Sequence, residues 1–548
     1  MLSAPPALAS LARVDAPLDL LVLGGGPAGA TIAALAAKEG LRVLVLEADA
    51  HPRVHVGESL LPGIIPILDA IGALADVEAA GFGLKTGSTH FGWGTTPEWD
   101  LHFADTDLYD HAWLVDRARF DAILLAAARR AGAEVWERSA AGDRLVGVTC
   151  RRRGEPDLLE LRARLVVDAT GQAALLARHL GLREHLPGLQ HQAAWAHFEG
   201  AAHLPPPRQH QAVFIAEAGH WIWLFPLGGG RTSIGVISLN DGAPAGDDAY
   251  DRLLAESPKL REILGPAARR VTPVRRQRDW SYRVTRLVGP GWLLVGDASG
   301  FIDPVLSTGV FLAMHAAYLA ARALTAALRG RADEHAALAG YERAHRELFA
   351  DLLRMVRFYY QQTLARDDYF WESKRILMSE DTEIRPQKAF MILTSGLVRN
   401  LALDDLQASQ GARQGGAIAA AAADLAAPDP AAAGPDRLGF LCLELRFADG
   451  APRPAALYLL LEPLHPAEPA LARTRNLQIN CLAPRFANDP IRDDRLRGPL
   501  TALFAALRDL DDRPGEPLAG FWRRRRPDLL AALRRLPPEI TLARAFGE

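Results

Sequence analysis

Apolar and polar residues near the start of the chain fall into three consecutive patterns. "DLLVL" (19–23) is a short apolar run, "GGGPAGATIAALAAKEG" (24–40) is rich first in Gly and then in Ala, and "RVLVLE" (42–47) is apolar again. Short apolar runs on either side of a Gly-rich turn and a helical stretch are typical of a β-strand, an α-helix and a second, parallel strand. The sequence therefore predicts a βαβ unit whose helix ends at Gly40.

Between residues 189 and 238 the pattern changes to an alternation of apolar and polar residues. "QAAWAHF", "QAVFIAE", "HWIWLFP" and "RTSIGVIS" each alternate apolar and polar residues. This period is typical of strands with one buried face and predicts an antiparallel sheet. "GWLLVGD" (291–297), a long apolar stretch after it and an amphipathic stretch over about 333–364 then predict a strand, a turn and two long helices. A helix is also expected over about 62–79, followed by a Gly-rich loop that contains Lys85.

These patterns predict an α/β fold. It consists of a GxGxxG-containing, Rossmann-like domain, an inserted antiparallel β-sheet that forms a substrate-side domain, and an α+β C-terminal module. The expected parts of the chain are an N-terminal tail (1–17), the main domain (18–400), a low-complexity linker (407–437) and the C-terminal module (438–548). Within the main domain, the nucleotide-binding part covers about 18–88, 112–180 and 285–365, and the sheet covers about 89–111 and 181–284.

Composition excludes several classes of function. The 548 residues carry a net charge of −3, which argues against a nucleic-acid partner. Cys150, Cys442 and Cys481 lie far apart without metal-ligand spacing, so we expect neither a disulfide framework nor a metal site. The first 19 residues lack the basic start and apolar core of a secretory signal, and we expect no membrane span. The expected location is the cytoplasm.

The Gly-rich turn has the spacing of a dinucleotide fingerprint. Gly24 is expected to make the tight turn, Gly26 to let the backbone approach a pyrophosphate, and Gly29 to let helix and strand pack closely. The N–H groups at the start of the helix attract phosphate, and Glu47 at the end of the second strand is placed to bind ribose hydroxyls. Further contacts with the nucleotide are expected from Pro27 and Ala28.

A second group of motifs resembles the FAD-binding fold of aromatic hydroxylases. "GDASGFIDP" (296–304) supplies a Gly-Asp turn with Asp297, and Arg117 in "LVDRARFD" matches a flavin-contacting position of that superfamily. The chain has one dinucleotide fingerprint, so the resemblance favours FAD over NAD alone. Asp168 is followed by Ala169, where single-component hydroxylases have Gly. The resemblance therefore implies that a separate NAD(P)H-flavin reductase supplies FADH2.

Two further motifs resemble those of the flavin-dependent halogenases. "GHWIWLFPL" places Trp221, Trp223, Phe225 and Pro226 in a W-x-W-x-I-P signature, with Phe225 replacing the usual Ile. The region "GESLLPGIIPILDAIG…GFGLKTGSTHFGWG" also resembles the family and places Lys85 on its catalytic lysine. "DDYFW" (367–371) is similar as well. The resemblance covers roughly residues 18–400.

The resemblance implies a mechanism and further site residues. FADH2 and O2 oxidise chloride or bromide to hypohalous acid, which moves through an internal passage to Lys85, while the two tryptophans keep the substrate away from the flavin. The halide is expected at Ser307, Thr308 and Gly309 in "LSTGV", where backbone N–H groups form an anion nest. An ordinary capped helix start explains the same residues equally well. Further flavin contacts are expected from Glu58, Ser59, Pro304, Gly309 and Val310.

The choice of lysine at position 85 carries information of its own. The chain contains five lysines among 62 basic residues, so arginine is its usual cation. A desolvated ammonium can lose its proton and become a nucleophile, whereas a guanidinium stays charged and accepts electrophilic halogen poorly. These properties favour a functional role for Lys85.

The expected substrate follows from a departure from the family pattern. Tryptophan halogenases carry Glu directly before "STG", whereas this chain has Leu306. The resemblance therefore implies an electron-rich phenolic or pyrrolic ring, free or tethered to a carrier protein, in secondary metabolism such as antibiotic biosynthesis.

Asp279 remains open as a residue against the flavin ring. Two other functions also remain open, an FAD-dependent aromatic monooxygenase and a prenyl-lipid flavin reductase.

Overall fold

The computed structural model describes two compact units of the chain. One comprises residues 1–105 and 111–398, and the other comprises 106–110 and 399–548. The described residues are 18–397, except 107–108, 138, 142–147, 153–157, 240–245, 362 and 378–385, together with 439–446, 452–460, 476–481 and 541–545. The predicted tail (1–17) and linker (407–437) lie outside them.

The first unit contains the predicted βαβ element. β1 (Leu18–Leu23) leads through the Gly-rich turn into α1 (Pro27–Lys38), and β2 (Val43–Glu47) pairs with β1 in parallel. Gly40 follows the helix with a φ of +72°, a conformation in which glycine is favoured. The sheet has the order β18-β19-β11-β1-β2-β7. Its other strands are β7 (Glu134–Glu137), β11 (Ala163–Asp168), β18 (Val288–Gly289) and β19 (Trp292–Leu294).

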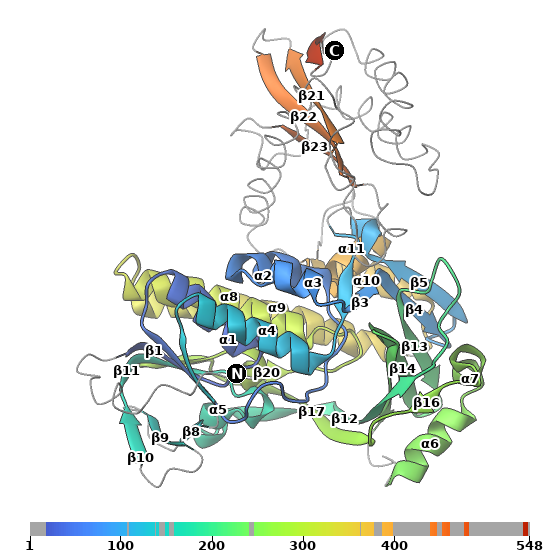
Figure 1. Cartoon of the computed structure of the whole chain (residues 1–548), viewed down its shortest axis with the longest axis horizontal. Helices are drawn as coiled ribbons and strands as arrows, with labels where there is room; N and C mark the ends of the chain where they lie inside the picture. The colour runs from blue at the N-terminus through green and yellow to red at the C-terminus, as the bar shows by residue number, and fades with distance from the viewer. Residues whose placement is uncertain are drawn as a thin grey trace, which may run out of the picture. The chain divides into compact units, whose positions relative to one another are not determined.

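Four helices lie side by side over this sheet. They are α1, α4 (Arg117–Arg130), α8 (Gly309–Leu328) and α9 (Glu334–Tyr359) (Figure 1). Among the described residues, α8 is the one helix long and apolar enough to cross a membrane. In the most apolar 18-residue stretch of α8, 67% is buried inside the unit, as is usual for the core helix of a soluble protein.

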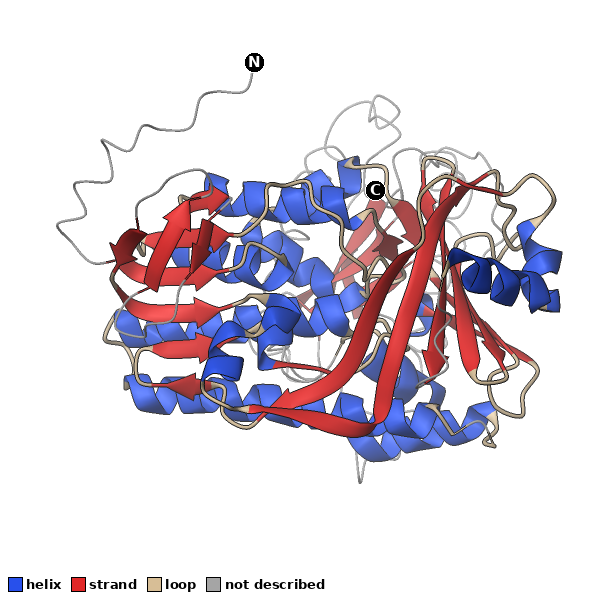
Figure 2. Cartoon of the chain, turned by 90° about the horizontal axis from the view of Figure 1, so that it is seen from below, coloured by secondary structure: helices blue, strands red, loops and turns tan. Residues whose placement is uncertain are grey.

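The second sheet of this unit has nine strands. Its order is β20-β17-β12-β15-β14-β13-β4-β5, with β16 also paired to β12 (Figure 2, long strands on the right). Its strands are β4 (Gly87–Phe91), β5 (Glu98–His102), β12 (Arg183–Glu199), β13 (Gln211–Glu217), β14 (His220–Gly228), β15 (Arg231–Leu239), β16 (Arg269–Arg270), β17 (Arg275–Val284) and β20 (Gly300–Phe301).

The sheet is antiparallel as predicted, with one exception. β13 pairs with β4 in parallel, because the chain passes through the nucleotide domain between these two strands and re-enters the sheet in the same direction. One face of the sheet packs on α6 (Asp247–Glu256) and α7 (Pro258–Leu264) through buried apolar side chains that include Tyr250 and Leu260. This packing leaves the opposite face available to border the nucleotide domain.

The segment before Lys85 differs from the prediction in two places. The predicted helix over about 62–79 begins as a 3-10 turn, η2 (Pro62–Ile64), which continues into α2 (Ile65–Ile71), and Gly72, with a φ of +74°, separates α2 from α3 (Leu74–Ala79). Lys85 was expected in a loop, but it is the last residue of β3 (Gly83–Lys85), which pairs with β6 (Ala112–Leu114). A three-residue strand shows no readable alternation in the sequence.

Short elements complete the first unit. They are β8 (Ser139–Ala141), β9 (Val148–Arg152), β10 (Leu158–Leu161), η4 (Gly171–Ala173), α5 (Leu175–His179), η6 (Gly296–Ser299), α10 (Arg366–Leu377) and α11 (Pro386–Thr394).

In the second unit, the described strands are β21 (Gly439–Arg446), β22 (Pro452–Leu460), β23 (Asn476–Cys481) and β24 (Thr541–Ala545), in the order β23-β22-β21-β24. β21 and β22 form an antiparallel pair within the predicted C-terminal module.

Two helical glycines should respond to alanine in opposite ways. A Cβ atom at Gly29 in α1 would lie 1.9 Å from the carbonyl oxygen of Gly24, whereas at Gly340 in α9 it would meet no atom within 4 Å. We expect Gly29→Ala to lower the free energy of unfolding by about 1–3 kcal/mol through overpacking. Gly340→Ala should raise it by about 0.5–1 kcal/mol through lower chain entropy. Denaturant unfolding measures both, and a Gly29→Ala protein as stable as the parent would contradict the close helix–strand approach.

Candidate functional site

A cavity of about 650 Å³ lies at the carboxyl ends of β1 and β2. This is the place where open α/β sheets bind nucleotides, and the volume lies within the usual range of ligand pockets. Most of the residues predicted from the sequence line it: Gly24, Gly26, Pro27, Ala28, Glu47, Glu58, Ser59, Arg117, Trp221, Trp223, Phe225, Asp297, Pro304, Ser307, Gly309 and Val310. Gly29, Lys85, Pro226 and Thr308 are not among the lining residues.

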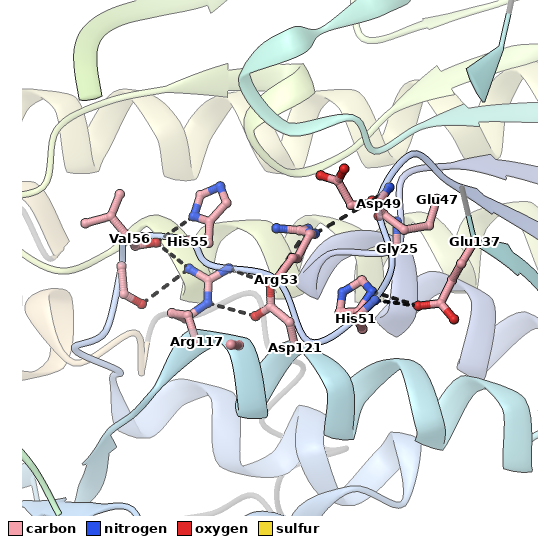
Figure 3. Close-up of polar contacts among 12 residues, drawn as sticks. Gly25, Glu47, Asp49, His51, Arg53, His55, Val56, Arg117, Asp121 and Glu137 are labelled. Carbon is pink, nitrogen blue, oxygen red and sulfur yellow. Dashed lines mark hydrogen bonds and ion pairs between the residues drawn. The ribbon is translucent and has the colours of Figure 1, made fainter. Parts of the chain in front are cut away.

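The start of α1 is built to receive an anion. Gly26 is the N-cap residue, no side chain caps the helix, and Pro27 occupies the first turn, so the free N–H groups of the helix start face the cavity. Glu47 is held at the rim because its Oε2 accepts a hydrogen bond from the Gly25 N–H at 2.6 Å, and its Oε1 accepts one from the Asp49 N–H at 2.9 Å (Figure 3). The geometry fits the phosphate and ribose parts of a dinucleotide.

Arg117 is fixed by a buried ion pair at the flank of the cavity. Its Nε and Nη2 donate to the two carboxylate oxygens of Asp121 at 2.8 and 3.0 Å, and its Nη1 donates to the Val56 carbonyl at 2.6 Å (Figure 3). The guanidinium keeps the pKa of Asp121 below its usual value, even though burial acts in the opposite direction. Burial and Arg117 together lower the pKa of His55 to about 4, so this ring is neutral near pH 7.

Sequence reasoning missed several residues of this flank. Asp49, Arg53 and His55 also line the cavity, and Arg53 reaches both Glu47 (3.7 Å) and Asp121 (3.8 Å). They lie between the end of β2 and the "GES" motif at 57–59. Their position in the sequence could have indicated their role, because a segment that joins two cavity-lining motifs must pass along the cavity.

Two aspartates from the sequence analysis have different environments. Asp297 lines the cavity, and burial raises its pKa to about 6 against the opposing effect of Arg117. Asp168 is fully buried and accepts hydrogen bonds from the N–H groups of Thr170 and Leu176, so its carboxylate is used to hold the turn after β11. Its neighbour Ala169 lines the cavity, whereas Asp168 is not among the lining residues. The side chain of Asp279 lies outside the description.

An aromatic wall, formed by Trp221, Trp223 and Phe225, borders the cavity from β14. Alternate residues of a strand face the same side, and all three line the cavity. The ring centroids of Trp221 and Trp223 are 6.0 Å apart, and those of Trp223 and Phe225 are 5.9 Å apart. Gly235 of β15 makes room for Trp223, because a Cβ there would lie 2.1 Å from the indole.

A buried polar network behind the aromatic wall was not predicted. Trp221 donates from Nε1 to the Tyr360 hydroxyl at 3.2 Å, and this hydroxyl donates to Asp303 at 2.9 Å. The other carboxylate oxygen of Asp303 lies 2.7 Å from Nδ1 of His191. Asp303 also accepts from the Val305 N–H at 2.9 Å, so the network ties the wall to the loop that precedes α8. The partners lie far apart in the sequence, which explains why no local pattern revealed them.

The predicted halide residues lie in a tight turn at the start of α8. Ser307 has a φ of +57°, a left-handed conformation that is uncommon for a residue with a side chain, and Thr308 is the N-cap residue with helical angles. Turns of this kind direct successive N–H groups to one point, which suits an anion. Thr308 makes no side-chain capping bond, so the capped-helix alternative lacks its hydrogen bond. Ser307 and Gly309 line the cavity.

Lys85 is buried, with 3% of its surface exposed. Its Nζ donates to the Ser59 hydroxyl at 2.9 Å and to the Leu60 carbonyl at 3.1 Å, and it lies 5.1 Å from the centre of the Phe103 ring. Burial lowers the pKa of Lys85 to about 7. The amine is therefore in exchange between its charged and neutral forms near neutral pH, which is the condition for a nucleophilic lysine.

Comparisons with known proteins agree with this geometry. The family model described as tryptophan halogenase matches residues 19–107 and 103–395. The tryptophan 2-halogenase of Chondromyces crocatus is 32% identical over 375 residues, which is 66% of this chain and 71% of that protein. The 1H-pyrrole-2-carbonyl-[peptidyl-carrier protein] chlorinase of Pseudomonas fluorescens is 30% identical over 382 residues, 63% of this chain and 84% of that protein.

A solved structure extends the similarity to the fold. The myxobacterial chondrochloren halogenase CndH, described as a variant of FAD-dependent halogenases, is 34% identical with a TM-score of 0.60. The alignment covers 70% of this chain and 91% of that one.

The burial of Lys85 should cost stability in a pH-dependent manner. Because the folded-state pKa of about 7 lies below the value of 10.5 that is usual for lysine in water, the unfolded chain binds the proton more tightly. The free energy of unfolding is therefore lowered by the full amount below about pH 7, and this loss becomes smaller as the pH rises toward 10.5. We expect Lys85→Met to raise the free energy of unfolding by a few kcal/mol at pH 6, about 5 kcal/mol at most, and by less at pH 9.

Denaturant midpoints at the two pH values measure this effect. Lys259→Met is the matched control, because Lys259 is a partly exposed surface lysine that pairs with Glu262, and it should give little change. A Lys85→Met protein that is less stable than the parent at pH 6 would show that the amine is not desolvated as described.

Proposed function

This chain belongs to the tryptophan halogenase family and is a flavin-dependent halogenase that uses FAD, O2 and a halide, and we propose a substrate for it. The proposed substrate is an electron-rich phenolic or pyrrolic ring. We propose further that the ring is free or tethered to a carrier protein, that a separate NAD(P)H-flavin reductase supplies FADH2, and that the enzyme works in the cytoplasm in secondary metabolism. The observation that carries the proposal is a buried lysine amine beside the predicted flavin cavity.

The cavity residues have the roles of binding and orientation. Reduced FAD, when bound, supplies with O2 the two-electron oxidation of chloride or bromide to hypohalous acid. The start of α1 and Glu47 hold the phosphate and ribose parts, and Arg117 and Asp297 flank the middle of the cavity. The turn at Ser307 and Gly309 directs N–H groups toward a halide.

The aromatic wall gives selectivity between two reactions. Trp221, Trp223 and Phe225 fill the side of the cavity that faces β14, and an apolar, packed wall excludes an organic ring from the oxidant. A small hypohalous acid needs a narrower path than an aromatic substrate. The network of Trp221, Tyr360 and Asp303 keeps this wall in place.

Lys85 receives the electrophile. With a pKa of about 7, its amine has a free lone pair in a large part of the molecules at neutral pH, whereas an arginine at this position would stay charged. Either the amine accepts halogen and becomes a haloamine, or the ammonium donates a hydrogen bond to hypohalous acid. Both routes place the halogen at a fixed atom, and orientation of this kind accounts for regioselective transfer.

Two observations support an activated ring as substrate. Leu306 is buried and apolar at the position where tryptophan halogenases have Glu. Burial lowers the pKa of Lys85, and no carboxylate among the described residues contributes to this shift. A ring that becomes more nucleophilic by deprotonation needs less assistance at the electrophile. The pyrrole-carrier chlorinase among the relatives supports a tethered substrate, and the tryptophan 2-halogenase makes free tryptophan the second candidate.

The need for a separate reductase is supported by the turn after β11. Asp168, which in single-component hydroxylases belongs to a pair that helps hold FAD and NADPH, is used here in local hydrogen bonds. Its neighbour is Ala169 rather than glycine.

Replacing Lys85 should separate halogen transfer from flavin oxidation. Lys85→Ala removes the amine, so we expect at least a hundredfold loss of halogenated product while reduced flavin is still oxidised by O2 at the cavity. Lys85→Arg distinguishes the two routes, because a guanidinium keeps its proton: it should be as inactive if the amine accepts halogen, and it should keep activity if a charged donor is sufficient. Mass spectrometry of products and oxygen uptake measure the two reactions. Undiminished chlorination by Lys85→Ala would remove Lys85 from the mechanism.

A substrate panel tests the ring. The enzyme is supplied with a flavin reductase, NADH, FAD and chloride or bromide, and with a phenol, a pyrrole-2-carbonyl carrier protein or free tryptophan. We expect halogenated phenol or pyrrole and little halogenated tryptophan, as read from product mass. Preferential halogenation of tryptophan would overturn the substrate assignment. A mass gain of one oxygen without halide would instead indicate the monooxygenase, and anaerobic reduction of a prenyl lipid would indicate the reductase.

A further inference from the structure

Lys85 lies in a small set of paired segments built around β6. On one side, β3 pairs antiparallel with β6, with Lys85 opposite Ala112 and Gly83 opposite Leu114. On the other side, the segment 58–60 also runs antiparallel to β6, with Ser59 opposite Leu114. Backbone bonds from the Leu60 N–H to Trp113 (3.0 Å) and from the Val115 N–H to Glu58 (2.8 Å) close this second pairing.

The register places Ser59 and Lys85 on one face. Residues directly opposite each other in paired strands point to the same side, and so do alternate residues of one strand. Ala112 and Leu114 therefore share a face with both Lys85 and Ser59. Ala112 is small and leaves this face open, so the long side chain of Lys85 reaches the Ser59 hydroxyl at 2.9 Å.

Ser59 also borders the cavity predicted to hold flavin and halide, whereas Lys85 is not among its lining residues. We propose that Ser59 is the positioning residue of Lys85: its hydroxyl orients the amine and connects it to the flavin cavity. This inference rests on the proposed function of Lys85. It gives the lysine a neutral hydroxyl partner in a chain that has Leu306 in place of the glutamate of the tryptophan-type pattern.

Glu58 and His90 are titratable neighbours of Lys85. From the segment 58–60, the Glu58 carboxylate bonds to His197 at 2.6 Å. The facing residues of β6 are apolar. From β4, His90 has its pKa lowered to about 3 by burial and by the charge of Lys85, so it stays neutral at the relevant pH. No carboxylate contributes to the pKa shift of the amine, whose cause is burial.

A serine hydroxyl suits this position because it serves both protonation states. The Leu60 carbonyl only accepts, so the amine must direct one N–H toward it. The Ser59 hydroxyl accepts from the ammonium and, after proton loss, donates to the lone pair of the amine. The Lys85 amine therefore keeps its orientation when its charge changes, and the hydroxyl, which lies at the cavity, offers a place where the proton can be passed on.

The test compares Ser59→Ala with Ser59→Thr in the full-length enzyme. Ser59→Ala leaves Leu60 as the remaining partner, and we expect kcat for halogenation to fall about tenfold or more because the amine loses its orientation. Ser59→Thr keeps the hydroxyl and should recover most of the rate. Ser257→Ala is the matched control, because Ser257 is a buried serine that caps α7 and does not line the cavity.

A second readout distinguishes positioning from folding. Removing an acceptor from the ammonium disfavours the charged form, so Ser59→Ala should lower the pKa of Lys85 by up to about one unit. Competitive labelling with acetic anhydride over a pH series, followed by peptide mass spectrometry, measures this pKa in the protein without substrate, with Lys259 as the exposed reference. The apparent pKa in the pH profile of kcat that reports Lys85 should also be lower in Ser59→Ala.

The outcomes separate this inference from the proposed function. If Lys85→Ala is inactive but Ser59→Ala keeps both the rate and the Lys85 pKa, the role of Ser59 is wrong and the role of Lys85 stands. If Lys85→Ala still halogenates, the proposed function itself fails. If Ser59→Ala and Ser59→Thr lose activity equally while the Lys85 pKa is unchanged, Ser59 acts through packing alone and the inference is overturned.

Discussion

The chemistry proposed for Lys85 depends on the burial of its amine, whose described hydrogen-bond partners carry no charge. Water stabilises an ammonium strongly, and the surroundings of Lys85 replace it with one hydroxyl, one carbonyl and the face of a ring. The pKa falls to about 7 for that reason. A carboxylate beside the amine would stabilise the charged form and raise this pKa. Burial lowers the pKa of Lys85 without opposition, because no carboxylate is among the described groups that contribute to the shift.

The fold separates the predicted flavin cavity from the lysine. The nucleotide domain contributes the start of α1, Glu47 and Arg117, and the large sheet contributes the aromatic wall. Both sets of residues border one cavity, and Lys85 lies beyond Ser59 on the short strand β3. The parallel pairing of β13 with β4 joins the strand after Lys85 to the strand before the wall, so the two regions are built on neighbouring strands.

The sequence was sufficient where the chemistry is local. The βαβ unit, the alternating strands and the turn before α8 each have a readable pattern, and nearly all the residues inferred from motifs lie around one cavity. Contacts between distant segments were not readable. The network of Tyr360, Asp303 and His191 joins three elements, and the strand that carries Lys85 is too short to show a period. The register around β6, which decides what Lys85 touches, becomes visible only in three dimensions.

The halide turn and the core of the first unit share one helix. α8 begins at the turn of Ser307 and Thr308 and continues as a mostly buried helix packed on α1 and α9. The N–H groups that would face the anion therefore inherit the rigidity of the core, and their spacing cannot change without repacking it. Attempts to engineer chloride against bromide selectivity should thus alter the partly exposed Pro304 and Ser307 of the preceding loop, because Val305 and Leu306 between them are buried, while the helix itself is left untouched.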